Sequence, residues 1–191
     1  MLDEKQITGE HLAPYLRNVD VQWGKINVED LPEMDFKGED VSRYSLRSGD
    51  LLVCEGGESG RAAVWRGELA ECFYQKALHR LRVRSERDLA FFMFYALQAY
   101  AKLGVFTGSE GKATIAHLPA ETFRRHRFAF PPCEEQSQVV SFLDGEAVRF
   151  DELIAEANRA IDLLQERRTA LISAAVTGKL MCEDAKHESC R

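Results

Sequence analysis

This sequence has few cysteines and no long apolar run, and each shortage excludes a class of protein. The five cysteines are widely spaced and none forms a C-x-x-C pair, so we expect neither a disulfide framework nor a zinc site. Residues 1–6 are mostly polar, unlike a secretory signal, and no apolar run approaches the roughly 20 residues of a membrane-spanning helix. We therefore expect a cytoplasmic protein with reduced thiols.

Signatures of catalysis are lacking as well. The five histidines are scattered, without metal-ligand spacing. Glu110 and Lys112 match half of a nuclease motif, but no Pro-Asp pair stands upstream in an expected strand, and residues 130–133 lack the acid or amide and the aromatic of an amino-methyltransferase motif. We expect no catalytic site, no metal and no cofactor. A small nuclease that uses Glu110 and Lys112 is an alternative of a different class.

Negative charge predominates in the whole chain but not in every part of it. The net charge of -6 over 191 residues argues, as a sum, against a nucleic-acid partner. However, residues 61–87 hold seven basic and three acidic side chains, a local charge of +4, and residues 124–127 form a second basic run. Residues 134–191 hold seven basic and twelve acidic side chains. A locally basic surface is therefore expected in the first two thirds of the chain.

Short elements are expected before Pro131. Apolar runs predict strands at 15–17, 51–54, 62–65 and 78–83, and residues 81–84 alternate with the period of a half-buried strand. A helix is expected from a cap at Ser85 through Leu103, with Gly104 as its stop. Residues 1–132 should therefore form one α+β domain, with residues 181–191 as a polar tail.

The clearest periodic signal is a heptad repeat within residues 133–180, which predicts a coiled-coil helix. Ten of its eleven seam positions are apolar. The seam comprises Val140, Leu143, Ala147, Phe150, Ile154, Ala157, Ile161, Leu164, Arg168, Leu171 and Ala175. A domain of this size has no second long helix to cover such a stripe, so we expect a partner helix; a helix folded back on its own domain is the alternative. Arg168 would set the register, near Glu146 or Asp151 of an antiparallel partner.

A glycine-rich loop at residues 55–61 lies between two expected strands. Its three glycines allow close backbone approach, and Ser59 and Arg61 offer hydrogen-bond donors to a phosphate or a base edge. It does not fit a nucleotide-binding loop, because the Lys-Ser/Thr ending and the following helix are both missing. A structural hairpin is the simpler interpretation of this loop.

In their order along the chain, several short motifs resemble the specificity (HsdS) subunit of type I restriction-modification systems. The Pro-Pro and Glu-Gln entry to a long helix that ends in Ala-Val-Thr-Gly-Lys is the most distinctive of them. The matching segments are residues 14–21, 44–46 with 49–52, 55–57 with 60–63, Gln75 with Leu78 and Arg80, Pro131-Pro132 with Glu135-Gln136, and 166–179. The resemblance covers roughly residues 8–180.

The resemblance implies a non-enzymatic target recognition domain for double-stranded DNA, followed by a long conserved helix. Catalysis would belong to the methyltransferase (modification) subunit and to a restriction subunit reached through the complex. The DNA-binding residues implied are Tyr15, Arg17, Asn18, Gly57, Ser59, Arg61, Gln75, Lys76 and Arg80.

A full subunit of this family has two recognition domains and two such helices, whereas this sequence has one of each. We therefore expect a half subunit that forms a homodimer and reads a bipartite site. The alternative is a truncated specificity fragment, a coiled-coil interaction protein without DNA binding.

Overall fold

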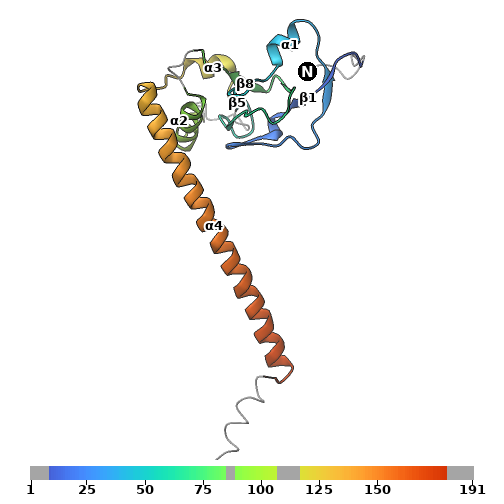
Figure 1. Ribbon diagram of the computed structural model, residues 1–191, viewed down its shortest axis with the longest axis vertical. Coiled ribbons are helices and arrows are strands. Elements are labelled where there is room, and N and C mark those ends of the chain that lie inside the picture. Colours follow the sequence, from blue (N-terminus) through green and yellow to red (C-terminus); the bar gives the residue numbers. More distant parts are fainter. Residues whose placement is uncertain (1–8, 85–88, 107–116, 180–191) are drawn as a thin grey trace, which may run out of the picture. The chain divides into compact units, whose positions relative to one another are not determined.

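The computed structural model describes residues 9–84, 89–106 and 117–179 of the chain (Figure 1). The chain divides into two compact units, Met1–Val140 and Ser141–Arg191. The first contains all the described strands and the shorter helices, and the second contains most of one long helix. The expected α+β class, with a globular domain followed by a long helix, is confirmed.

Three small sheets form the framework of the first unit within its described residues. One has the order β4-β1-β7, one is the hairpin β2-β3, and one is the antiparallel sheet β6-β5-β8. The strands are β1 Leu12–Leu16, β2 Val21–Gln22, β3 Lys25–Ile26, β4 Glu33–Asp35, β5 Leu51–Cys54, β6 Ala62–Val64, β7 Phe73–Tyr74 and β8 Leu78–Leu81.

Strand β5 is the centre of the hydrophobic core because both of its faces are buried. Leu52 and Cys54 pack into the core cluster that contains Trp65, whereas Leu51 and Val53 pack into a second cluster with residues of helix α2. Side chains alternate between the two faces of a strand, so an uninterrupted apolar run such as 51–54 fits a strand covered on both sides. The strand expected at 51–54 is present, and the one expected at 62–65 is present over Ala62–Val64.

Four α-helices and one 3-10 helix complete the described fold. Met93 and Leu97 on α2 are buried against the β6-β5-β8 sheet. The helices are the 3-10 helix Asn18–Asp20, α1 Glu39–Tyr44, α2 Ala90–Lys102, α3 Ala120–Arg125 and α4 Cys133–Val176. The short elements that were not expected from the sequence are β2, β3, β4, β7, α1, α3 and the 3-10 helix.

The strand expected at 78–83 is shorter than its alternating sequence suggested. It ends at Leu81, whose partner Leu51 is the first residue of β5. The backbone N–H of the preceding residue, Asp50, donates to the Arg47 carbonyl in a turn and is not available to a strand at Arg82. No β5 residue is therefore left to pair with Arg82, and the expectation that residues 82–84 continue the strand was wrong.

The helix expected from Ser85 to Leu103 begins later than the sequence suggested. Its expected cap, Ser85, lies outside the described residues, and α2 starts at Ala90 after an extended Leu89. The backbone N–H of Leu89 donates to the Gln136 side chain (3.0 Å) instead of entering a helical turn. At the other end Gly104 has φ 72°, so the expected glycine stop is present.

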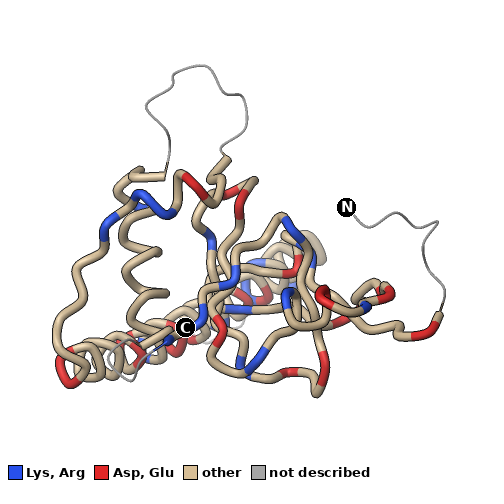
Figure 2. The backbone as a smooth tube through the Cα atoms, turned by 90° about the horizontal axis from the view of Figure 1, so that it is seen from above, with Lys and Arg blue, Asp and Glu red and all other residues tan. Residues whose placement is uncertain are grey.

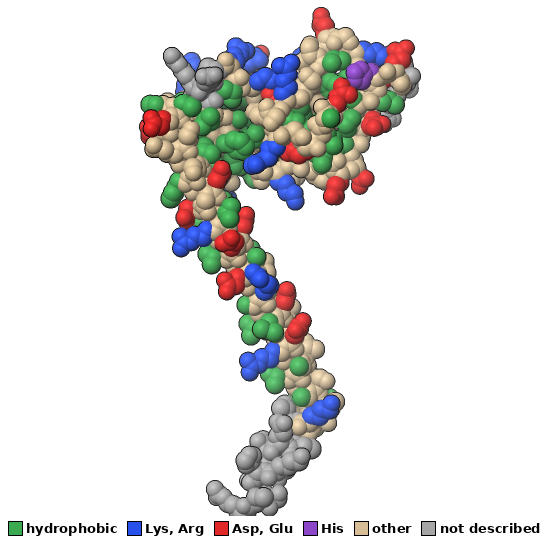
Figure 3. Space-filling model, in the orientation of Figure 1, with side chains coloured by type: hydrophobic (Ala, Val, Ile, Leu, Met, Phe, Trp, Pro, Cys, Tyr) green, Lys and Arg blue, Asp and Glu red, His purple; other side chains and the backbone are tan. Residues whose placement is uncertain are grey.

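Helix α4 extends over 44 residues, about 65 Å at 1.5 Å per residue. It starts after Pro131-Pro132, and it ends where Gly178 takes φ 74° and the Lys179 N–H donates to Ala174 (2.9 Å). Apolar side chains recur along its exposed surface between acidic and basic ones (Figure 3). Phe150, Ile154 and Leu164 of the seam are 57%, 59% and 63% exposed. Within the described residues, no helix combines the length and apolarity needed to span a membrane.

Candidate nucleic-acid interface

The glycine-rich loop is a tight hairpin between β5 and β6. Gly57 and Gly60 have φ 74° and 86°, and the Gly60 N–H donates to the Cys54 carbonyl (3.1 Å). A Cβ on Gly60 would lie 2.5 Å from the ring of Phe106, so only glycine fits that position. The geometry of the hairpin alone therefore explains the glycine at position 60, without a ligand.

Arg61 and Asn18 hold this hairpin to the segment that follows β1. The Arg61 guanidinium donates to the Asn18 carbonyl (3.0 Å) and to the Asn18 Oδ1 (3.1 Å). The Asn18 side-chain amide in turn faces the carbonyls of Gly56 and Ala77 at 3.3 and 3.4 Å. The structure thus brings together Asn18, Arg61 and the turn after β7 through hydrogen bonds within the fold, although the buried Nε of Arg61 has no hydrogen-bond partner within the described residues.

Arg17 is likewise hydrogen-bonded to another residue of the domain, although its own side chain is partly exposed. Its guanidinium donates to both carboxylate oxygens of the buried Asp20, at 2.9 and 2.8 Å. This charge-assisted pairing raises the pKa of Arg17. The arginine fixes the 3-10 turn Asn18–Asp20, because Asp20 also accepts from the Arg17 backbone N–H (2.7 Å).

Three other expected residues lie around these contacts. Ser59 is buried, and its Oγ has no hydrogen-bond partner within the described residues. The Tyr15 ring packs edge-on against Phe36 at 6.4 Å between centroids. The Gln75 backbone N–H donates to Leu16 (3.0 Å) next to the β1-β7 pairing. A role in DNA binding stays a prediction for each of these side chains.

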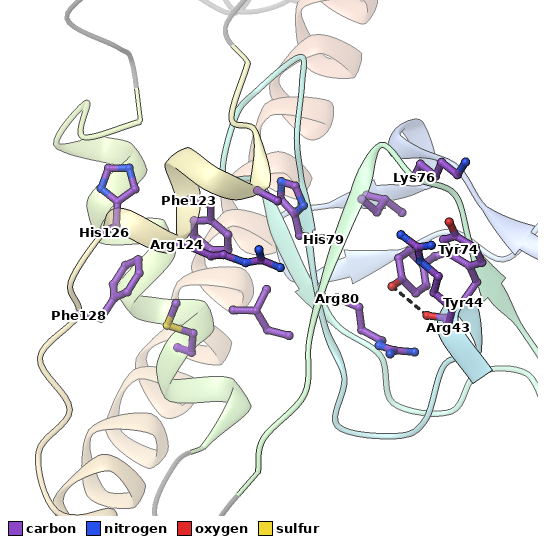
Figure 4. Close-up of a pocket in the computed structure, with 14 residues that line it drawn as sticks. Arg43, Tyr44, Tyr74, Lys76, His79, Arg80, Phe123, Arg124, His126 and Phe128 are labelled. Atoms are coloured by element: carbon purple, nitrogen blue, oxygen red, sulfur yellow. Dashed lines mark hydrogen bonds between the residues drawn. The ribbon is translucent and has the colours of Figure 1, made fainter. Parts of the chain in front are cut away.

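Lys76 and Arg80 lie on a different feature, a pocket of about 600 Å³ (Figure 4). Lys76 is exposed in the β7-β8 turn, and Arg80 comes from β8. Figure 4 shows α3 on one side of the pocket and the β7-β8 region with α1 on the other. The residues that line it are Arg43, Tyr44, Tyr74, Lys76, Leu78, His79, Arg80, Leu81, Met93, Ala120, Phe123, Arg124, His126 and Phe128.

The walls of this pocket are fixed by contacts of the chain itself. The Arg80 guanidinium donates to the Ser45 carbonyl (2.6 Å) and lies over the Tyr74 ring, 5.5 Å from its centroid. On the α3 side the His79 ring stacks on Phe123 at 5.7 Å. These contacts come from segments far apart in sequence, so the pocket depends on the fold of the whole domain.

Two basic residues of the pocket, Arg43 and Arg124, were not among the expected site residues. Arg124 belongs to the basic run 124–127 noted in the sequence, but nothing there connected it with Lys76. Arg43 is in α1, a helix the sequence did not predict, and no sequence signal marks it.

Another arginine of the basic stretch, Arg82, is neutralised. Its guanidinium donates to both oxygens of the fully buried Asp50, each at 2.6 Å, and this bonding raises the pKa of Arg82. Basic and acidic residues are interspersed along the backbone of the first unit (Figure 2). The charge of the sequence stretch 61–87 therefore overstates the charge that this stretch presents to a partner.

Relatives of the chain are found by comparison of whole sequences. No family model matches it. It is 26% identical over 149 residues to the type I restriction enzyme EcoBI specificity subunit of Escherichia coli, covering 78% of this chain and 30% of that protein. It is 24% identical over 169 residues to a putative type I restriction enzyme MjaX specificity subunit of Methanocaldococcus jannaschii, covering 86% and 39%. The chain thus spans about a third of the length of these curated relatives.

A solved structure supports the same relationship at the level of the fold. The chain superposes on a chain from work on complex assembly and conformational transition of a type I R-M system, with a TM-score of 0.56 and 20% identity. The match covers 77% of this chain and 33% of the other. The resemblance carried by the short motifs is confirmed: the chain is HsdS-like, similar in sequence to two type I restriction enzyme specificity subunits and in fold to a chain of a type I R-M system.

Proposed function

We propose that this chain recognises a specific DNA sequence as a specificity component of a type I restriction-modification system. The observation that carries the proposal is the similarity to two specificity subunits over 149 and 169 residues, 78% and 86% of the chain, which is too long to be confined to residues 1–132. Residues 1–132 would be the target recognition domain, residues 133–180 the spacer and dimerisation helix, and residues 181–191 a polar tail. Catalysis would belong to the methyltransferase and restriction subunits, so this chain is not an enzyme.

The proposal includes a homodimer formed through the seam of α4. Burying the exposed seam side chains against a second helix would stabilise the pair at roughly 25 cal/mol per Å² of apolar surface. In an antiparallel pair, Arg168 would approach Glu146 or Asp151, which supplies one defined register. Two recognition domains related by a two-fold axis would then read a bipartite, palindromic site.

The methyltransferase subunit is proposed to contact apolar side chains of α4 outside the seam. Phe142, Leu153 and Leu163 are 67%, 53% and 66% exposed, and none of them is a seam residue. A seam between two helices leaves Phe142 and Leu163 in water, whereas Leu153 directly precedes the seam residue Ile154 and flanks the seam. Exposed apolar side chains outside the seam support a helix that contacts two proteins, a second copy of this chain and the methyltransferase subunit.

Selection from a random duplex library tests this function. The full chain would be co-expressed with its cognate methyltransferase subunit, and the bound duplexes would be sequenced. We expect enrichment of two short half sites separated by a spacer of constant length. Enrichment of no sequence by a stable complex would contradict the proposal and favour the interaction protein without DNA binding.

A further inference from the structure

The pocket between α3 and the β7-β8 region is basic although the chain as a whole is acidic. Three arginines and one lysine line it, from α1, the β7-β8 turn, β8 and α3, and no Asp or Glu is among its lining residues. The chain has 31 acidic and 25 basic residues, so a pocket of this size with one sign of charge is not what its composition predicts.

The basic side chains of the pocket differ from Arg17 and Arg82 in what they contact. Arg17 and Arg82 donate to the buried carboxylates of Asp20 and Asp50. By contrast, Arg43, Lys76 and Arg124 are exposed. Within residues 9–84, 89–106 and 117–179, these three form no ion pair with a carboxylate. Their charges are therefore available to an anionic partner.

Arg80 is a positive group held in place on the side of the pocket that also carries Arg43 (Figure 4). The Ser45 carbonyl and the Tyr74 ring hold its guanidinium in place. The Tyr74 hydroxyl in turn donates to the Arg43 carbonyl (3.2 Å), which ties α1 to this wall. Figure 4 shows Arg124 on the opposite side of the pocket from Arg43 and Arg80. Cations on two facing walls suit an extended polyanion that passes between them.

From this arrangement we propose that the pocket binds the phosphodiester backbone of duplex DNA, with Arg43, Lys76 and Arg124 contacting phosphates. The inference rests on the proposed function, and it separates the residues that contact phosphates from those that contact bases. Contacts to phosphates position a protein on DNA without reading sequence. The pocket therefore contributes affinity and orientation, and side chains elsewhere in the domain distinguish bases.

The salt dependence of DNA binding tests this assignment. The full chain and its double variant Lys76→Gln/Arg124→Gln would be titrated with two fluorescent 30-bp duplexes from about 50 to 200 mM salt. One duplex would carry the selected site and the other a random sequence. Each lost phosphate contact lowers the slope of log K against log salt by about 0.9. We expect a slope smaller by roughly 2, with the same loss of affinity on both duplexes.

Matched variants control for charge and for folding. Lys25→Gln/Arg66→Gln removes two exposed charges that do not line the pocket, and we expect it to leave the slope unchanged. Lys76→Arg/Arg124→Lys keeps both charges in the pocket and should keep the slope of the wild type. The variants at Lys76 and Arg124 should have the melting temperature of the wild type, because the substituted side chains are exposed. Arg66→Gln also removes a guanidinium that lies over the Phe91 ring at 5.0 Å, so the melting temperature of the control variant is measured beside its slope.

Each contrary result has a distinct meaning. An unchanged slope for Lys76→Gln/Arg124→Gln, or an equal decrease for the Lys25→Gln/Arg66→Gln control, would overturn the pocket assignment while leaving DNA recognition intact. Loss of affinity on the selected duplex alone would also overturn it, because the residues would then read bases. Absence of binding to either duplex at 50 mM salt by the wild-type chain in complex with its methyltransferase subunit would overturn the proposed function itself.

Discussion

At the scale of single residues, the partner of each basic side chain decides what it can do. Arg82 binds Asp50, which lies 32 positions away in the sequence, and Arg61 binds Asn18, which lies 43 positions away. Arg43 and Lys76 keep their charges at the surface. The sequence around each of these four residues does not show the difference, because the partners Asp50 and Asn18 lie on other segments of the chain. Among the site residues that the family resemblance implied, the structure separates Arg17 and Arg61, which bind other parts of the fold, from Lys76 and Arg80, which line a pocket.

Gln136 shows a structural role for one of the motifs that carried the family resemblance. Its side chain is fully buried. Its Oε1 accepts from the Leu89 N–H (3.0 Å), and its Nε2 donates to the Pro131 carbonyl (2.8 Å). The amide thereby joins the start of α4 to the segment before α2.

Replacing Gln136 by alanine should destabilise the domain. The substitution leaves the Leu89 N–H and the Pro131 carbonyl without this partner, and an unsatisfied buried polar group costs about 1 to 3 kcal/mol. Urea denaturation of the full chain would measure the change in the free energy of unfolding. Gln138→Ala is the matched control: Gln138 is exposed on the same helix, and we expect a change within about 0.5 kcal/mol. Equal stability of the two variants would contradict the proposed role.

At the scale of elements, the sequence predicts best where one periodic signal decides the structure. The apolar run 51–54 and the heptad repeat of α4 each impose an element that is present. Helix α1, with six residues, carries no such signal, and it is held by its contacts: Tyr44 is buried against Tyr74 at 5.5 Å between ring centroids. Because α1 supplies Arg43, the basic pocket could not be assembled from the sequence alone.

Variants of two neighbouring leucines of α4 can distinguish the proposed dimer seam from the rest of the helix surface. Leu164 is a seam residue and is 63% exposed, whereas Leu163 is outside the seam and is 66% exposed. Leu164→Glu should shift the chain from dimer to monomer, because it places a carboxylate in the apolar seam. Leu163→Glu should leave a dimer that binds the methyltransferase subunit less tightly. Light scattering would report masses relative to the 21.6 kDa chain.

The same pair of variants can refute the dimer. A wild-type chain that is monomeric at micromolar concentration, or a Leu164→Glu variant that keeps the dimer mass, would contradict a seam made by these residues. A loss of the dimer in Leu163→Glu alone would place the dimer interface on the helix surface that carries Leu163.

At the scale of the whole molecule, the charge is divided between parts with different proposed tasks. Residues 134–191 account for twelve of the 31 acidic residues, and the basic pocket lies in the unit Met1–Val140. The net charge of -6 therefore does not argue against DNA as a partner of that unit. In the proposed assembly the domain supplies DNA contacts, and the helix supplies contacts to protein partners.

The most direct measurement of the central claim is a map of methylated bases in a host genome that expresses the chain with its cognate methyltransferase subunit. The account predicts methylation at one bipartite, palindromic motif that disappears when the chain is omitted. Methylation that is the same with and without the chain, or its absence despite a stable complex, would contradict DNA recognition by this protein.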